Sequence, residues 1–194
     1  MNLFQTIAVY SISIITCSMC CSNSSLAQAQ PIDSTSRHWQ AGAELDVLPY
    51  ATGGYFAAGW VGKKQLRLRS LYAVVNKPSF LLPDGFAAYK IQSAAVLVDY
   101  FRKPNWQGFW VGAGLVYWNN ELRTDANHST GHFDLWLANG SMGYHWRLGK
   151  RFYISPWAGM SMRIAGAKAV AAGPLSYKPP FLNPELSVKG GIIL

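Results

Sequence analysis

Apolar and polar side chains alternate along most of this chain, and that period of two limits its possible folds more than any other feature. Successive side chains of a β-strand point to opposite faces, so the alternation predicts strands. Segments of this kind are separated by turn-forming residues. We identify eight, at about 39–49, 54–62, 65–75, 89–101, 108–119, 132–147, 151–164 and 184–194.

The connections between these segments alternate in length. Short turns fall at 62–64, 102–105 and 148–151, whereas 76–88, 120–131 and 165–183 are long and only the first connection of that second set, around 50–53, is brief. Short turns at one end and longer loops at the other, with an even number of strands, are typical of bacterial outer-membrane barrels. The expected fold class is therefore all-β, an eight-stranded antiparallel up-and-down transmembrane β-barrel over residues 38–194.

Each clearly alternating strand has one nearly uncharged face and one face that carries charge. In 132–147, Trp136, Met142 and Trp146 share the first face, and His145 and Arg147 share the second. Strands 54–62 and 108–119 are apolar on both faces and predict no orientation. A soluble sheet would alternate too, with its apolar face inward. Aromatic residues near the strand ends favour a membrane barrel, whose interfaces hold aromatic girdles.

An eight-stranded barrel is just wide enough for side chains to fill its interior. If the apolar faces meet lipid, the charged faces point inward, where buried charges need partners. We therefore expect a side-chain-filled lumen with one internal network, in which loss of Arg163 would leave a carboxylate unpaired. The expected lumen residues are Glu44, Asp46, Arg67, Arg69, Asp99, His145, Arg147, Arg163, Glu185 and Lys189.

The first 30 residues have a different composition and contain no charged side chain. An apolar stretch runs from Leu3 to Met19, and Ala27 and Ala29 have the spacing that signal peptidase reads. We expect a cleaved secretory signal at 1–29, a short segment at 30–37, and export to the outer membrane of a Gram-negative bacterium. A basic n-region is missing, which leaves a wrongly assigned start codon or an uncleaved anchor as the alternatives. The chain's three cysteines all precede Ala29, so the mature chain would have none.

The short turns and two long loops are candidates for contacts with the surroundings. The turns carry basic pairs that would face the periplasm and meet anionic headgroups, or would simply aid solubility: Lys63, Lys64, Arg102, Lys103, Lys150 and Arg151. The two loops are unusually apolar, so they predict either a binding surface or a cap packed over the barrel mouth. Their candidate residues are Phe80, Leu81, Leu82, Phe86, Leu175, Tyr177, Phe181 and Leu182.

Reactive groups do not form a convincing catalytic or metal pattern. His128 and His132, with two nearby aspartates, are best interpreted as a solvated loop. His145 with Ser141 or Ser161 would be a base and a nucleophile, but the expected parity turns them into the lumen. We expect no enzyme, no cofactor and no metal. Nucleic-acid binding is excluded because the net charge of +8 is dispersed over turns.

Together, the signal, the eight alternating segments and a last strand running to Leu194 resemble the small outer-membrane β-barrel proteins of Gram-negative bacteria, of OmpA, OmpX and OmpW type. The chain departs from that class by ending in Ile192-Ile193-Leu194, without a terminal aromatic residue. The resemblance implies a non-enzymatic cell-envelope protein, porin-like in build, with a structural or interaction role and outer-membrane lipid as its surroundings.

Two other functions remain open from the sequence. One is a carrier or channel for small apolar molecules, admitted through loops 76–88 and 165–183 as in the OmpW type. The other is a soluble periplasmic carrier of lipocalin type, which also has eight strands. The lipocalin-like fold would place the apolar faces inward around a ligand and the charged faces in water. A small apolar ligand or a cell-envelope partner is implied by these functions, and the sequence does not identify either.

Overall fold

The computed structural model describes residues 38–125 and 129–194. The expected signal peptide, the segment 30–37, the three cysteines and His128 lie outside the described residues.

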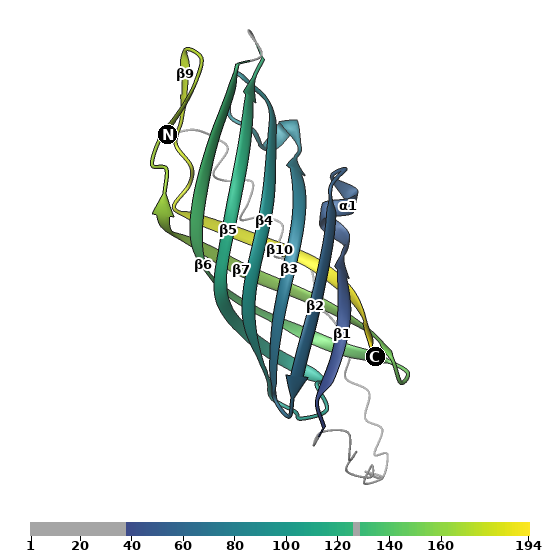
Figure 1. Ribbon diagram of the computed structural model, residues 1–194. Coiled ribbons are helices and arrows are strands. Elements are labelled where there is room, and N and C mark those ends of the chain that lie inside the picture. Colours follow the sequence, from purple (N-terminus) through teal and green to yellow (C-terminus); the bar gives the residue numbers. More distant parts are fainter. Residues whose placement is uncertain (1–37, 126–128) are drawn as a thin grey trace, which may run out of the picture. The chain divides into compact units, whose positions relative to one another are not determined.

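Eight strands pair antiparallel and close into a barrel, which confirms the predicted fold class (Figure 1). Each strand pairs with its neighbour along the chain, and the first and last strands complete the ring. The strands are β1 (Gln40–Asp46), β2 (Tyr55–Lys63), β3 (Leu66–Lys77), β4 (Phe86–Phe101), β5 (Gly108–Thr124), β6 (Thr130–Leu148), β7 (Phe152–Gly166) and β10 (Leu182–Ile193).

The connections contain the remaining elements. They are helix α1 (Val47–Ala51), the 3-10 turn η4 (Ser79–Leu81) and a hairpin of β8 (Val170–Ala172) and β9 (Leu175–Tyr177). No helix among the described residues is long and apolar enough to cross a membrane.

The predicted strand bounds need two corrections. Strands β4, β5 and β6 extend further toward the long loops than the alternation indicated, as far as Phe86, Thr124 and Thr130. The strand predicted at 39–49 ends instead at Asp46, because that side chain caps α1 and accepts a hydrogen bond of 3.2 Å from the Leu48 N–H. Pro49 suits the first turn of a helix, where its missing N–H costs little.

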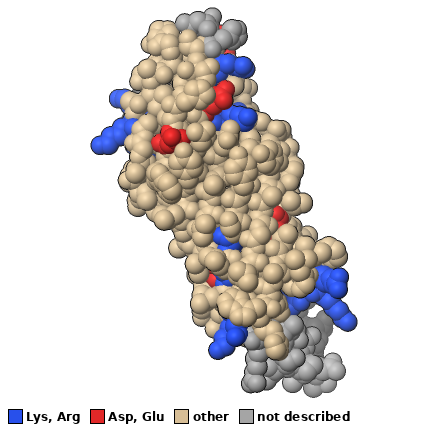
Figure 2. All heavy atoms as spheres, viewed as in Figure 1, with Lys and Arg blue, Asp and Glu red and all other residues tan. Residues whose placement is uncertain are grey.

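Side chains orient with the charged faces inward and the apolar faces outward. In β6, Leu137 and His145 are buried inside while Met142 and Trp146 are exposed, as the parity predicted. The two strands without a predicted orientation turn their tryptophans inward, Trp60 in β2 and Trp110 and Trp118 in β5. Most charged atoms on the visible surface lie toward its two ends (Figure 2). This orientation is the reverse of a lipocalin-like barrel, so that alternative is wrong.

The outer surface carries an apolar belt bounded by aromatic side chains. Near the short turns, the outward ring of Tyr144 contacts those of Phe109 and Trp146, in each case with centroids 4.9 Å apart. Toward the loops, Tyr55 meets Tyr72 at 6.0 Å and Tyr117 meets Trp136 at 5.1 Å. Beyond that second ring the outward residues become polar, as in the 2.8 Å hydrogen bond that Asn119 donates to Asp134. Such girdles mark the two interfaces of a membrane barrel.

Candidate functional site

The half of the barrel next to the short turns, called here the closed half, is filled around a cluster of buried ion pairs. Arg67 contacts Glu44 at 2.7 Å and Asp99 at 2.9 Å. Arg69 contacts the same two carboxylates, at 3.4 and 2.9 Å. The two arginines share a face of β3 because they are two residues apart, and Arg67 pairs with Asp99 across β3 and β4. All four side chains are fully buried.

Aromatic rings surround these ion pairs. The Arg67 guanidinium lies 5.4 Å from the Trp60 ring and 5.0 Å from the Phe101 ring, and Arg69 lies 5.4 Å from Trp110. Tyr153 accepts a 2.7 Å hydrogen bond from the Trp60 indole and donates one of 2.8 Å to Glu44. The charges are therefore paired, hydrogen-bonded and sealed by rings, which is what buried charge requires.

Glycines make room for the large inward rings of the closed half. Trp60 pairs across strands with Gly42, Trp110 with Gly143, and Tyr153 with Gly191. A Cβ added at any of these glycines would collide with the ring of its partner. Glycines inside strands thus mark close approaches of side chains to the backbone.

Trp106 closes the end of the barrel and was not recognised in the sequence. It follows the turn after β4, is almost completely buried, and meets Trp60 edge-on at 5.0 Å. Its indole donates to the backbone carbonyl of Lys64. In the sequence, the only indication of its role was that an apolar residue stands within a polar turn. The six basic turn residues are exposed at this same end.

Six of the ten predicted lumen residues lie outside the ion-pair cluster. Arg163 donates to the backbone carbonyls of Ala167 and Pro179, so the expectation that its loss would unpair a carboxylate is wrong. Arg147 donates to the carbonyl of Lys150. His145 stacks on Tyr153 with centroids 4.1 Å apart. The others are Asp46, Glu185 and Lys189, which line the opposite half of the lumen.

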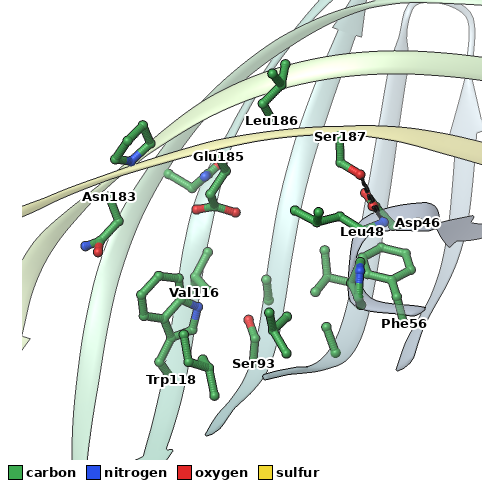
Figure 3. A pocket seen from close by; sticks show the side chains of 18 of the residues that line it. Asp46, Leu48, Phe56, Ser93, Val116, Trp118, Asn183, Glu185, Leu186 and Ser187 are labelled. Carbon is green, nitrogen blue, oxygen red and sulfur yellow. Dashed lines mark hydrogen bonds between the residues drawn. The ribbon is translucent and has the colours of Figure 1, made fainter. Parts of the chain in front are cut away.

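That opposite half contains a cavity of about 680 Å³, between β10 and the inner faces of β3, β4 and β5 (Figure 3). The prediction of a filled lumen therefore describes only the closed half. Several inward positions here are too small to fill the space, among them Ala73, Ser93 and Ala95. On β3, β4 and β5 the apolar wall includes Leu71, Ala73, Val75, Ile91, Ala95, Leu97, Val116 and Trp118.

One side of the cavity offers polar atoms that have no protein partner. Ser161 donates a 2.6 Å hydrogen bond to Glu185 and accepts one of 2.9 Å from the Asn139 Nδ2. The remaining Asn139 Oδ1 is buried without a partner, as are Ser141 Oγ and Asn183 Nδ2. Buried polar groups are nearly always hydrogen-bonded, so these three atoms are available to a ligand or to water.

Three of the charged groups that line the cavity contact neutral side chains. The Lys189 ammonium lies 4.0 Å from the Trp157 ring centroid and 5.3 Å from that of Trp110. Asp46 accepts a 2.8 Å hydrogen bond from the Trp157 indole and another from the Ser187 hydroxyl. Asp46, Glu185 and Lys189 thus contact neutral side chains, with Trp157 shared by Asp46 and Lys189, and the unpartnered neutral atoms are left for a ligand.

The candidate loop surface divides into a packed part and an exposed part. Tyr177 of the β8–β9 hairpin meets Phe86 and Tyr89 edge-on at 5.8 and 5.7 Å, and burial raises the pKa of its hydroxyl. Leu82 and Leu175 pack against the same cluster. Phe80, Leu81, Phe181 and Leu182 remain exposed. The packed part covers the barrel at its loop end, which is the cap that the sequence offered as one interpretation.

The reactive groups considered in the sequence do not assemble. Neither ring nitrogen of His145 has a hydrogen-bond partner in the described part of the chain, so Ser141 and Ser161 are not activated by it. Across residues 38–125 and 129–194, no group of three or more His, Cys, Asp or Glu side chains is placed to hold a metal ion.

The fold and interior define the class of this molecule, an eight-stranded barrel with buried ion pairs inside and an apolar exterior, which is the architecture of small transmembrane barrels. Among solved structures it is similar to the N-terminal beta-barrel domain of Pseudomonas aeruginosa OprF, with a TM-score of 0.49 and 13% identity, covering 80% of this chain and 96% of that one. No family model and no curated protein matches the sequence.

Proposed function

We propose that this protein is an integral outer-membrane barrel that binds a small, mostly apolar molecule in its cavity and does not conduct through its closed half. The observation that carries this proposal is the 680 Å³ apolar cavity with three unpartnered polar atoms. It favours the carrier function over a purely structural role. Ligand sites commonly combine an apolar lining of this size with a few polar groups that fix orientation.

The outer surface supports the membrane part of the proposal. The belt between the aromatic rings is aliphatic, with Val96, Val98 and Leu115 about half exposed. Exposing such a belt to water would be costly, whereas lipid accepts it. Charged residues inside and apolar residues outside are the arrangement of the transmembrane barrels of bacterial outer membranes.

Fractionation of expressing cells tests the location. We expect the protein in the outer-membrane fraction, with detergent needed for extraction. On gels it should migrate differently before and after boiling in SDS, because a closed barrel resists cold SDS. Recovery in the soluble periplasm without a shift would overturn the membrane assignment.

The cavity chemistry defines the ligand class. Asn139 Oδ1 can only accept a hydrogen bond, Asn183 Nδ2 can only donate, and the Ser141 hydroxyl can do both. A neutral group that both donates and accepts, such as a hydroxyl or an amide, satisfies them. The apolar wall accommodates an alkyl chain attached to that group. We therefore propose a single-chain alcohol or amide as the ligand class, with enzymatic activity absent.

A filled-cavity variant tests ligand binding. A long-chain alcohol carrying a diazirine is added to the barrel in phosphatidylcholine vesicles, and labelled peptides are mapped by mass spectrometry. We expect inward residues around Val116 to be labelled in the wild type and protected in Ala95→Phe, whose ring would occupy the cavity.

Ala94→Phe is the matched control, because Ala94 is the adjacent residue and faces outward. It should leave labelling of the cavity unchanged. Absence of inward labelling in the wild type, or equal labelling in Ala95→Phe, would contradict a ligand site. A structural role would then be the better-supported function.

A further inference from the structure

We infer that the cavity opens sideways into the membrane, through a gap in the barrel wall between β10 and β2 that α1 only partly covers. The inference rests on the proposed ligand and adds its route: an apolar chain would arrive from the lipid, not from water. Four observations support it, and they concern strand register, the attachment of α1, the lining of the cavity and the position of the belt.

The register leaves part of the wall without a strand. Strand β1 pairs with β10 only from Gly42↔Ile193 to Asp46↔Lys189, and then the chain turns into α1. Strand β10 continues along β7 as far as Leu182↔Met162. Over 182–188, no described strand pairs with its other edge. Pro184 lies in this stretch, as expected of an edge strand, because proline cannot donate to a ladder.

The other rim of the gap is formed by β2, together with α1. The pairing of β1 with β2 ends at Glu44↔Ala58, so residues 55–57 of β2 also extend past β1. Helix α1 is anchored on this side: the Tyr50 hydroxyl donates to the Phe56 carbonyl at 2.7 Å, and the Gly54 N–H donates to the Pro49 carbonyl at 2.8 Å.

Toward β10, the hydrogen bonds of α1 and its cap converge on a single side chain among the described residues. The Leu48 N–H donates to Ser187 Oγ at 3.3 Å, and the Ser187 hydroxyl donates to Asp46. A contact made by one hydroxyl is far easier to break than a ladder of backbone bonds, each of which contributes about 0.5–1.5 kcal/mol. Ser187 therefore acts as a latch between α1 and β10.

The cavity passes through the wall at this position. Its lining includes Leu182 and Leu186 of the outer face as well as inward residues such as Phe56 and Val116. Leu186 is 72% exposed and points away from the cavity, while Glu185 and Ser187 of the same strand point into it (Figure 3). Residues from both the inner and the outer face of one strand can line the same cavity only where one side of that strand is unpaired, as it is here in β10 among the described strands.

The gap faces the apolar belt. The outward residues of β10 between Leu182 and Ile192 carry no charge, and the exposed side chains of α1 include Val47 and Leu48. An outer groove lined by Leu45, Val47 and Ile192 adjoins the gap at Asp46, which borders both spaces. At the loop end, the packed hairpin with Tyr177 covers the barrel. The loop-end rim of the cavity also contains apolar residues, among them Phe80 and Pro180, so entry past the loops is the alternative from which the test must separate the sideways route.

A disulfide across the latch tests this route. In the double variant Leu48→Cys, Ser187→Cys, oxidation would fix α1 to β10, and reduction would release it. The probe is the same diazirine alcohol in phosphatidylcholine vesicles, and the readout is the time course of inward labelling around Val116 and Trp118. We expect oxidation to abolish inward labelling and reduction to restore it, while labelling of outward residues stays unchanged.

A second disulfide at the loop end is the matched control. The pair Phe86→Cys, Tyr177→Cys would fix the hairpin to β4 and should leave inward labelling unaffected. Labelling that survives the latch disulfide but is lost with the hairpin disulfide would show that the ligand passes the loops, which overturns the sideways route and leaves the ligand site intact. No inward labelling in the reduced protein or the wild type would instead overturn the proposed function.

Ser187→Ala tests the latch without a disulfide. Removing the hydroxyl breaks the hydrogen bonds to Leu48 and Asp46, so inward labelling should become faster than in the wild type. Ser70→Ala is its control, because Ser70 is exposed on the outer face of β3. An unchanged rate in Ser187→Ala would contradict the latch even if the cysteine pair does not oxidise.

Discussion

At the scale of residues, the closed half depends on the matching of large rings with glycines. A Cβ at Gly143 would lie 2.7 Å from Cζ2 of Trp110 and 2.6 Å from the carbonyl oxygen of Pro156. Both distances are too short for a carbon contact, and the backbone cannot move without disturbing two strand pairs. We expect Gly143→Ala to lower the free energy of unfolding by about 1–3 kcal/mol, the usual cost of overpacking.

Urea unfolding of the barrel in vesicles measures this effect, and Gly140→Ala is the control. Gly140 lies on the same strand, and a Cβ there would meet no atom within 4 Å. Equal unfolding midpoints for the two variants would contradict the packing described for Trp110.

The ion pairs make a second residue-scale prediction. Arg67→Met would leave Glu44 and Asp99 buried with Arg69 as their shared arginine, and breaking a buried pair typically costs about 3–5 kcal/mol. Arg163→Met removes only bonds to backbone carbonyls, so its effect should be smaller. The same unfolding experiment compares them. A larger loss in Arg163→Met would reverse the roles assigned to the two arginines.

Alternation predicted which residues point inward, because parity is a property of a single strand. It could not predict which inward charges meet. Arg67 reaches Asp99 because β3 and β4 align these residues, whereas Arg163 lies near the loop end, beside backbone carbonyls. Alternation gives the face of each residue but not the register between strands, which also depends on turn geometry and on the neighbouring strands.

At the scale of elements, the β8–β9 hairpin packs as a cap through the Tyr177 ring, with Ala172 and Leu175 in the same cluster. Tyr177 is 8% exposed and contacts Phe86, Tyr89 and Phe133. We expect Tyr177→Ala to make the segment 167–181 susceptible to limited proteolysis while the barrel stays folded. Phe181→Ala, at an exposed residue, should not do so. Protection of the hairpin in Tyr177→Ala would show that its position does not depend on that ring.

Strand β1 is shorter than the alternation predicted, and its early end is what leaves the cavity open beside β10. Residues 47–49 continue the apolar character of the strand, so alternation predicts that it goes on. The helix depends on a cap from Asp46 and on the Ser187 contact across 139 residues of sequence from Leu48. A tertiary contact of this kind overrides a local pattern. The gap in the wall, and with it the open cavity, could not be found from periodicity.

At the scale of the whole molecule, the barrel has two halves with different roles. Paired charges and packed rings fill the closed half, and small side chains leave the other half hollow. A ligand that enters the cavity therefore meets a wall of ion pairs. Passage of ions would require the separation of buried charges and the displacement of Trp106 at the turn end, both of which are costly.

We accordingly expect no steady ion conductance when the purified protein is inserted into planar bilayers. Four ion pairs between Glu44, Asp99, Arg67 and Arg69 occupy the narrow cross-section, and eight strands leave no water-filled lumen beside them. A wide sixteen-stranded porin inserted under the same conditions provides the positive control, and the shift in gel mobility on boiling verifies that the barrel was folded. Steady conductance would mean that the closed half opens, and it would make the channel function the better account of the cavity.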